Sequence, residues 1–324
     1  MRQDPPISDQ TKRITVVVPA YRVSEQLPQV VATIGEEVSK IIVVDDFCPE
    51  DSGKKLQQIT SDPRVEVIFH HKNLGVGAAV KTGYRRALEI GSDVVIKLDG
   101  DGQMDPKEIK SLVKPIFSLG ADYVKANRFF EPEAIRQMPK SRIIGNLFLS
   151  FMTKLSTGYW RIFDPNNGFT AISAEKLKHI PLNKVADRYF FESDMLFRLY
   201  LVSAAVVDIP IPAKYGKERS NLKIKRVIIE FPFKHSKNFL KRIVYSYYIR
   251  EFNLASLQLP IGIFLGILGI VRGATAWHSS NITQIPTAPG TVVLFAVLIL
   301  TSIQLILAFL NFDINNEPKL KYYS

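Results

Sequence analysis

The chain has little of several things that mark common classes of site. It holds one cysteine, Cys48, among 324 residues, which excludes an intrachain disulfide and fits a reducing compartment. It holds five histidines, and no spacing of His and Cys matches a zinc site. No Gly-x-x-x-x-Gly-Lys-Ser/Thr segment occurs, so a P-loop is excluded. The polar segment 1–13 lacks the apolar core that a signal peptide needs.

Acidic residues are the minority among the charges, with 31 Asp and Glu against 42 Lys and Arg and a net charge of +11. Such an excess suits nucleic acid, anionic lipid or a phosphorylated substrate. Much of it gathers in 214–250, where only Glu218 and Glu230 are acidic. Within this block, Ile224–Tyr248 mixes basic with apolar residues, which favours an interfacial helix on anionic headgroups. An ordinary solvated basic helix is the alternative.

Charge almost disappears from two later segments. Residues 254–277 contain one charged residue, Arg272, and residues 291–312 contain none. Each segment is close to the ~20 residues that a membrane helix needs, with a pair of buried core helices as the alternative. Gly262, Gly266 and Gly269 give the first segment a small-residue face suited to close helix packing.

The connector between these segments, 279–290, has no Lys or Arg, whereas both outer flanks do. The positive-inside rule therefore predicts a cytoplasmic soluble region of about 250 residues, a short loop outside and a cytoplasmic C-terminal tail. The expected location is an inner, plasma or ER-type membrane, with both termini in the cytoplasm.

The soluble region shows strands alternating with helices, which predicts an α/β fold with an open, mostly parallel sheet. In the first half the strands are expected at 14–18, 41–44, 65–70 and 94–98, and the helices at 27–38, 53–61, 76–90 and 106–118. In the second half helices are expected at 142–157 and 186–201, and strands within 163–172 and at 206–211. Polar residues follow the strands of the first half, at the edge where open α/β sheets bind ligands.

The segment Asp99-Gly100-Asp101-Gly102-Gln103 follows one of these strands and carries the strongest chemical signal. Its carboxylate and amide oxygens are ligands that Mg2+ and Mn2+ prefer, and Mg2+ often shares its shell with substrate phosphates. The bland alternative is an acidic turn that caps the next helix, with Asp105 as N-cap and Pro106 at N1. The run Gly75–Val80 lacks the third small residue of a dinucleotide loop, and it lies at the third strand rather than the first, so NAD binding is disfavoured.

Four segments in order carry a family resemblance: VVVPAYRVSEQLPQV, IIVVDDFCPEDSG, HHKNLGVGAAVKTGYRRAL and VVIKLDGDGQMDP. Together they resemble family 2 glycosyltransferases of the GT-A (Rossmann-like) fold. The two C-terminal apolar segments narrow the resemblance to polyprenyl-phosphate glycosyltransferases, the group of bactoprenol glucosyltransferase and dolichol-phosphate mannose synthase. The resemblance implies a cytoplasmic GT-A catalytic domain over 1–222, basic juxtamembrane helices over 223–253, two transmembrane helices over 254–312 and a tail over 313–324.

The resemblance also implies roles for residues. A metal, Mg2+ or Mn2+, would be held by Asp99, Asp101 and Gln103. The donor would be bound by Pro19, Tyr21, Asp45, Asp46, Lys72, Gly75 and Asp99, with Lys81 less certain. The catalytic set would be Asp101, Asp164, Arg128, Arg142 and Arg219, in which the arginines face phosphate. The loop Asp164–Phe169 would lie beside the reacting sugar, and the loop Tyr215–Ser220 would close over the donor and the acceptor.

Two departures from the family pattern leave base recognition open. Val23 stands where an acidic residue is usual, and Phe47-Cys48 replaces the usual Gly-Ser after the paired aspartates. A general base, if one is used, is open between Asp164, Glu192 and Asp194.

The implied reaction is inverting transfer of a hexose from a nucleotide-sugar, UDP-glucose-like or GDP-mannose-like, to a membrane polyprenyl monophosphate. Nucleic acid is not an expected partner, and homo-oligomerisation is left open. A processive polysaccharide synthase would carry Gln-x-x-Arg-Trp and more membrane spans, neither of which occurs. A catalytically silent membrane scaffold of the same fold is the other alternative, against which the intact Asp99, Asp101 and Gln103 set argues.

Overall fold

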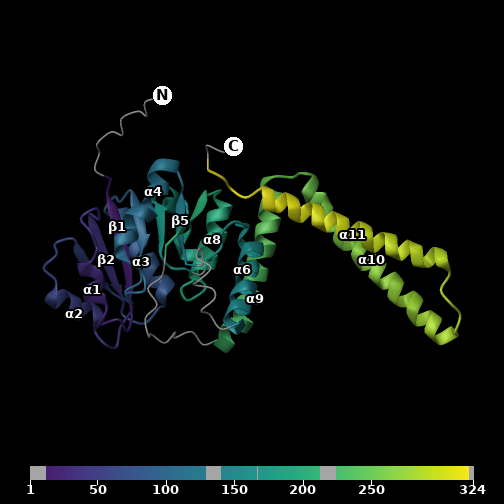
Figure 1. The fold of residues 1–324 in the computed structure, drawn as a ribbon, viewed down its shortest axis with the longest axis horizontal. Coiled ribbons are helices and arrows are strands. Elements are labelled where there is room, and N and C mark those ends of the chain that lie inside the picture. Colours follow the sequence, from purple (N-terminus) through teal and green to yellow (C-terminus); the bar gives the residue numbers. More distant parts are fainter. Residues whose placement is uncertain (1–11, 129–139, 166, 212–223, 321–324) are drawn as a thin grey trace, which may run out of the picture. The chain divides into compact units, whose positions relative to one another are not determined.

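The computed structural model describes residues 12–128, 140–165, 167–211 and 224–320. The chain separates into two compact units, each described here by itself (Figure 1). The first comprises Met1–Asn238 and Pro318–Ser324, and the second comprises Phe239–Glu317.

The first unit is built on a seven-stranded sheet within the described residues, in the order β3-β2-β1-β4-β6-β5-β7. Its strands are β1 (Ile14–Ala20), β2 (Lys40–Asp45), β3 (Val65–Phe69), β4 (Val94–Lys97), β5 (Tyr123–Asn127), β6 (Thr170–Ser173) and β7 (Val206–Pro210). All pairings are parallel except those of β6, which runs antiparallel to β4 and β5. The expectation of a mostly parallel α/β sheet is therefore confirmed.

Helices cover both faces of this sheet (Figure 1). Their bounds are α1 (Leu27–Ala32), α2 (Ser52–Ile59), α3 (Val76–Glu89), η1 (Pro106–Glu108), α4 (Ile109–Leu119), α6 (Lys140–Thr157), α7 (Ala174–Lys178), η2 (Leu182–Lys184) and α8 (Phe191–Leu201). Apolar side chains of α1, α2 and α4 pack with Val16, Val43 and Ile96 on one face. Those of α3, α7 and α8 pack with the alternate residues Val17 and Val95 on the other. Burial from both sides explains why β1 is apolar at every position except Thr15.

Two expected helices are shorter than the sequence predicts. The expected helix 27–38 ends at Ala32, because the guanidinium of Arg64 takes the carbonyls of Ile34, Gly35 and Val38 as acceptors at 3.2, 2.6 and 3.0 Å. The expected helix 186–201 begins only at Phe191, because the preceding chain is held against α3. Strand β5 was not predicted from the sequence at all.

Helix α9 (Ile224–Val244) crosses the boundary between the units. Its first part belongs to the first unit, where His235 Nδ1 lies 2.8 Å from Ser156 Oγ of α6 and Asn238 Nδ2 donates to Asp194 Oδ1 at 3.0 Å. The compact units divide after Asn238. The expected domain boundary at 222/223 lies outside the described residues and stays a prediction.

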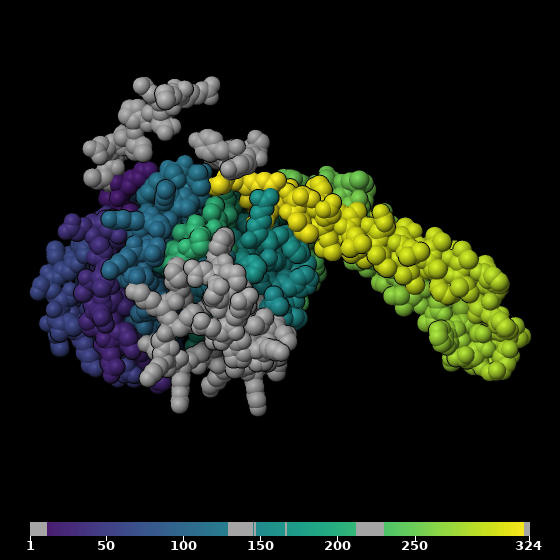
Figure 2. Space-filling model, in the orientation of Figure 1, coloured from purple at the N-terminus to yellow at the C-terminus, as the bar shows by residue number. Residues whose placement is uncertain are grey.

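The second unit contains two long apolar helices, α10 (Leu254–Thr283) and α11 (Pro289–Asn315), which lie against each other (Figure 2). Both are long and apolar enough to cross a membrane, with mean hydropathies of 2.1 and 2.7. Only 22% and 11% of their most apolar windows are buried, unlike the core helices of a soluble protein. The expected small-residue face is the packing face: a Cβ at Gly262 would lie 3.1 Å from Ile306, and one at Gly269 would lie 2.8 Å from Ile299.

A fully buried ion pair joins the start of this unit to its end. Arg242 donates to both oxygens of Asp313 at 2.6 and 2.9 Å, and the hydroxyl of Tyr247 donates to the same carboxylate at 2.6 Å. Both charged side chains are inaccessible to solvent. The π-helical turn η3 (Tyr245–Arg250) places Tyr247 for this contact.

Candidate active site

The sheet brings the predicted site residues to one edge. Six of the seven described strands run in one direction, and β6 runs in the opposite direction. The C-terminal ends of the six strands therefore lie at the same edge of the sheet as the N-terminal start of β6. Tyr21, Asp46, Asp99 and Arg128 follow these ends, and the loop containing Asp164 precedes β6. Ligands of open α/β sheets bind at this edge.

The Asp99–Gln103 turn begins two residues beyond β4. The side chain of Asp99 is 29% exposed, and Asp101 Oδ1 accepts a hydrogen bond from the backbone N–H of Gln103 at 3.0 Å. Gly102 has φ +78°, which permits the tight turn. The helix cap is a separate feature, since Asp105 Oδ1 accepts from the N–H of Lys107 at 3.1 Å.

The described residues contain no group of three or more His, Cys, Asp or Glu side chains arranged to hold a metal ion. Two carboxylates and one amide would therefore supply part of a coordination shell and leave the remainder to other oxygens. This donor set fits Mg2+ or Mn2+, because such ions are commonly held by one or two carboxylates together with substrate phosphates and water.

A buried lysine lies under this turn. Lys97 is the last residue of β4, and its Nζ lies 2.7 Å from Asp99 Oδ1 and 3.2 Å from Glu192 Oε1 of α8. Burial by itself would lower the pKa of Lys97, but the two carboxylates outweigh it and raise the pKa above its usual value. The ammonium is therefore charged at neutral pH, and it links Glu192 of α8 to Asp99 of the Asp99–Gln103 turn.

The loop before β6 is fitted around this lysine. A Cβ at Gly168 would lie 2.2 Å from Lys97 Nζ and 2.7 Å from Asp99 Oδ2, so a side chain there would displace the pair. The neighbouring Asn167 donates to the carbonyl of Ala126 at 2.7 Å, and its own carbonyl accepts from Lys125 Nζ at 2.5 Å. Burial lowers the pKa of Lys125 to about 8, against the attraction of Asp164, Glu192 and Asp208.

Arg128 and Asp164 form a bidentate ion pair at the end of β5. Nε of Arg128 donates to Oδ2 at 2.7 Å and Nη2 donates to Oδ1 at 3.0 Å. Asp164 is almost completely buried, whereas Arg128 is about a quarter exposed. The pair fixes the plane of the guanidinium at the sheet edge.

The three carboxylates considered as a general base differ in their surroundings. Asp164 is held by Arg128, and Asp194 accepts from the N–H of Ala186 at 2.9 Å as well as from Asn238. Glu192 is paired with Lys97 and is 13% exposed, more than the other two. Neighbouring Asp208 on β7 accepts from the N–H of Phe163 at 2.7 Å, and burial raises its pKa to about 6.

The paired aspartates at the end of β2 are both buried, and their side chains accept hydrogen bonds from within the protein. Asp45 accepts from the N–H groups of Cys48 and Gly53, both at 2.7 Å, which shapes the loop into α2. Asp46 accepts from the N–H groups of Leu74 and Gly75 at 2.9 and 2.7 Å.

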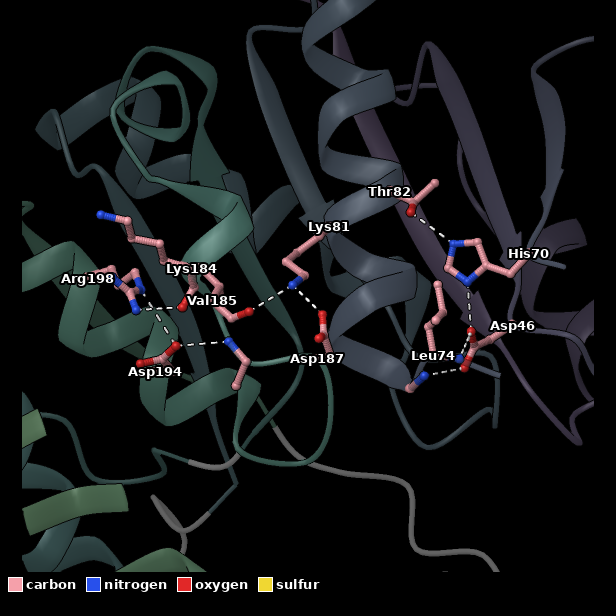
Figure 3. A network of polar contacts seen from close by, with 12 residues as sticks. Asp46, His70, Leu74, Lys81, Thr82, Lys184, Val185, Asp187, Asp194 and Arg198 are labelled. Carbon is pink, nitrogen blue, oxygen red and sulfur yellow. Dashed lines mark hydrogen bonds and ion pairs between the residues drawn. The ribbon is translucent and has the colours of Figure 1, made fainter. Parts of the chain in front are cut away.

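His70 completes the arrangement around Asp46 (Figure 3). Its Nδ1 lies 2.7 Å from Asp46 Oδ1, and its Nε2 lies 2.9 Å from Thr82 Oγ1 on α3. The cluster thus ties the ends of β2 and β3 to the start of α3. Among the remaining donor candidates, Pro19 is buried within β1, Lys72 is exposed, and Tyr21 is 39% exposed with the Arg22 guanidinium 5.5 Å from its ring centre.

Lys81, a less certain donor candidate, has partners within the fold (Figure 3). Its Nζ donates to the carbonyl of Val185 at 2.8 Å and forms a short ion pair with Asp187. Gly75, at φ +104°, is close to the same segment, since a Cβ there would lie 2.6 Å from the carbonyl of Asp187. The glycine therefore lets the chain before α8 approach α3.

Sequence reasoning did not single out Lys97, Lys125, His70 as a partner of Asp46, or Asp208. The available signal was a lysine inside an otherwise apolar strand, in Val94–Lys97 and again in Tyr123–Asn127. For Arg142 only the backbone is described, within α6, and Asn166, Arg219 and the loop Tyr215–Ser220 lie outside the described residues.

Comparison with known proteins gives a consistent set of matches. A family model described as glycosyl transferase family 2 matches residues 15–180. UDP-N-acetylglucosamine–dolichyl-phosphate N-acetylglucosaminyltransferase of Methanococcus voltae is 30% identical over 218 residues, which cover 63% of this chain and 86% of that protein. Polyprenol monophosphomannose synthase of Mycolicibacterium smegmatis is 29% identical over 214 residues, covering 64% and 80%.

A solved structure of glucosyl-3-phosphoglycerate synthase from Mycobacterium tuberculosis, in complex with Mn2+, UDP and phosphoglyceric acid, has a similar fold. Its TM-score is 0.52 at 18% identity, and the match covers 71% of this chain and 78% of that chain. At this identity the likeness concerns the fold alone.

Proposed function

The chain belongs to glycosyl transferase family 2, and on that premise we propose that it transfers a hexose from a nucleotide-sugar to a polyprenyl monophosphate in the membrane, with inversion at the anomeric carbon. The observation that carries the proposal is the partly exposed Asp99–Gln103 turn at the sheet edge where the Arg128–Asp164 pair and the Gly168 loop converge. The relatives named for dolichyl and polyprenol phosphate products support the lipid acceptor, as do the two long apolar helices.

Asp99, Asp101 and Gln103 would hold Mg2+ or Mn2+ at the diphosphate of the donor. The bound ion supplies neutralisation of the negative charge that develops on the leaving diphosphate. The protein's part is to fix these ligands, which it does through the hydrogen bond from Gln103 N–H to Asp101 and the Lys97–Asp99 contact.

The nucleotide would lie over the ends of β1 and β2, with Pro19 and Tyr21 bordering the base. Asp45 and Asp46 shape the loops there, Gly75 is the N-cap of α3, and Lys72 lies in the loop before it. A carboxylate has about four acceptor positions, and Asp46 uses three of them on His70, Leu74 and Gly75. One position is thus left for an N–H of the base.

Arg128, with Arg142 and Arg219, would bind the phosphate groups of donor and acceptor. Positioning two anions against each other is the main task of such a site, and charge-assisted hydrogen bonds from fixed guanidinium groups are suited to it. The lipid phosphate is already anionic at neutral pH, because its second pKa is about 6. Its oxygen attacks the anomeric carbon, the bond to the nucleoside diphosphate breaks, and no proton has to be removed. Glu192 and Asp164 would then contact the sugar rather than act as an obligatory base.

We further propose the cytoplasmic orientation of the first unit that the positive-inside rule predicts, so that the site meets a lipid phosphate at the membrane surface. The basic residues before α10 would attract that phosphate.

The decisive experiment offers radiolabelled sugars on UDP and GDP, with polyprenyl phosphate, to the full-length protein in detergent or membranes. Label should enter an organic-extractable lipid with one donor and require Mg2+ or Mn2+. No labelled lipid with any donor, in a preparation whose thermal unfolding shows it to be folded, would contradict the proposal.

A further inference from the structure

A lysine side chain with 1% exposure lies directly beneath the Asp99–Gln103 turn. Lys97 contacts the carboxylates of Asp99 and Glu192, at 2.7 and 3.2 Å. Burying an ammonium group costs free energy unless the group is paired with an opposite charge. The presence of a lysine inside this buried strand therefore needs a structural or functional explanation. Fixing Asp99 needs only a hydrogen-bond donor, whereas Lys97 also places a positive charge on the inner side of this candidate metal ligand.

A second buried lysine, Lys125, shows that burial alone does not explain the contacts of Lys97. Lys97 and Lys125 lie on either side of Thr170 in the sheet, in register with it and on the same face. Lys125 donates to a backbone carbonyl, that of Asn167, and so holds a loop. Lys97 instead meets two carboxylates, one of which is a candidate metal ligand.

The surrounding chain is shaped to keep this contact. Gly168 leaves the space in which Lys97 Nζ and Asp99 Oδ2 both lie, within 2.2 and 2.7 Å of where its Cβ would be. Glu192 is brought to the lysine by α8, whose start is fixed by Asp194 and by the Lys81 contacts with the preceding segment. Three separate parts of the chain thus converge on one ammonium group.

We propose that Lys97 is a positioning residue that acts as an internal counter-cation of the metal site. Resting on the proposed function, this means that Lys97 neutralises Asp99 while no nucleotide is bound, and so weakens the binding of a free divalent cation. A nucleoside diphosphate brings the missing negative charge together with further oxygen ligands. Metal and nucleotide then bind cooperatively, and the ion enters chiefly with the donor.

Equilibrium binding of Mn2+ to the purified full-length protein tests this directly. Free Mn2+ is measured by its electron paramagnetic resonance signal, without nucleotide and with saturating UDP or GDP. In Lys97→Met, which keeps the length of the side chain without its charge, Mn2+ should bind about tenfold more tightly in the absence of nucleotide, since a like charge beside a ligand carboxylate is removed. The cooperativity factor between Mn2+ and the nucleotide should fall by a similar ratio.

Two further variants separate this role from structural damage. Lys125→Met removes a buried ammonium from the same face and should leave the Mn2+ affinity within about twofold of wild type, because no metal ligand is its partner. Glu192→Gln removes a negative charge from the same cluster and should weaken Mn2+ binding. Damage to the site would weaken binding in every variant, so the opposite signs for Lys97→Met and Glu192→Gln are diagnostic.

Thermal unfolding checks that each variant is folded. Should Lys97→Met fail to fold, Lys97→Gln carries the same expectation, because it can still donate a hydrogen bond to Asp99. Unchanged or weaker Mn2+ binding in the folded, neutral variant overturns the counter-cation role and leaves the proposed function standing. Absence of Mn2+ binding by wild type, even with nucleotide, overturns both the metal assignment and this inference.

Discussion

Two pairs of acidic residues follow strands of the same sheet, on either side of β1, and their surroundings are opposite. Asp45, the last residue of β2, and Asp46, the next residue, are buried, and their oxygens accept hydrogen bonds from backbone N–H groups, with His70 beside Asp46. Asp99 and Asp101, after β4, are partly exposed at the same edge. In sequence both pairs look like ligand-binding carboxylates at strand ends.

The difference shows how a fold divides its carboxylates between framework and ligand binding. A buried carboxylate with several N–H donors organises the loops that supply them, and its removal leaves those donors unsatisfied. A carboxylate with an exposed oxygen can change partners when a ligand arrives. The comparison therefore predicts that replacing Asp99 or Asp101 lowers activity with little loss of stability, whereas replacing Asp45 or Asp46 lowers stability as well.

The largest effect should come from Asp101→Ala. It removes a metal-ligand oxygen and should lower sugar transfer by about 10³-fold or more, as expected when a group that stabilises transition-state charge is lost. The midpoint of thermal unfolding should stay close to that of wild type. Transfer of radiolabelled sugar to lipid and the unfolding midpoint are measured on the same preparation. Turnover at the wild-type rate would refute the metal assignment.

The buried ion pair between Arg242 and Asp313 in the second unit should affect stability rather than sugar transfer. Arg242→Met leaves Asp313 buried without its cation and should destabilise the protein by about 3–5 kcal/mol. Replacing both residues, Arg242→Met with Asp313→Leu, should recover much of that loss, because the uncompensated charge is gone. Denaturation in detergent followed by helical circular dichroism measures both. A double variant as unstable as the single one would argue against an ion pair of this kind.

Asp46→Ala tests the framework pair at the sheet edge. It leaves the N–H groups of Leu74 and Gly75 and the ring of His70 without their acceptor, and should cost about 3 kcal/mol of stability. Urea unfolding midpoints report the loss. Tyr21→Ala is the matched control, since Tyr21 is exposed at the same edge and should leave stability nearly unchanged. Equal midpoints for Asp46→Ala and wild type would remove the distinction between the two pairs.

An effect of similar size, spread over the range from pH 6.5 to pH 4, is expected at the contact between α6 and α9. Burial lowers the pKa of His235 to about 4, from an ordinary value of 6.5. The unfolded chain therefore takes up this proton first as the pH falls, and stability contributed above pH 6.5 is lost as the pH approaches 4, by about 3 kcal/mol. His235→Gln should lack this component, so its stability relative to wild type should rise steadily from pH 7 to pH 4.5. Parallel dependences for the two proteins would contradict it.

The first half of the sheet could be predicted from the sequence, and the second half only in part. Strands β1, β2 and β4 are buried on both faces, and in the sequence they are recognisable as runs rich in Val and Ile. Strand β5, Tyr-Val-Lys-Ala-Asn, carries a lysine in its middle and reads as polar, although that lysine is buried and bonded to Asn167. The sequence pattern predicts too early a start for α8, because contacts from Lys81 hold the preceding residues in a loop.

Local sequence patterns are enough to identify the family, the alternation of strands and helices, the acidic turn after β4 and the two long apolar helices. These follow from local patterns, since periodicity, runs of apolar residues and motif order are readable along the chain. The tertiary structure decided which charged groups face each other. Lys97 meets Glu192, Arg128 meets Asp164, and Arg242 meets Asp313 across distances in sequence that no local pattern spans. Partnership and burial set what a charged group can do, and both exist only once the chain has folded.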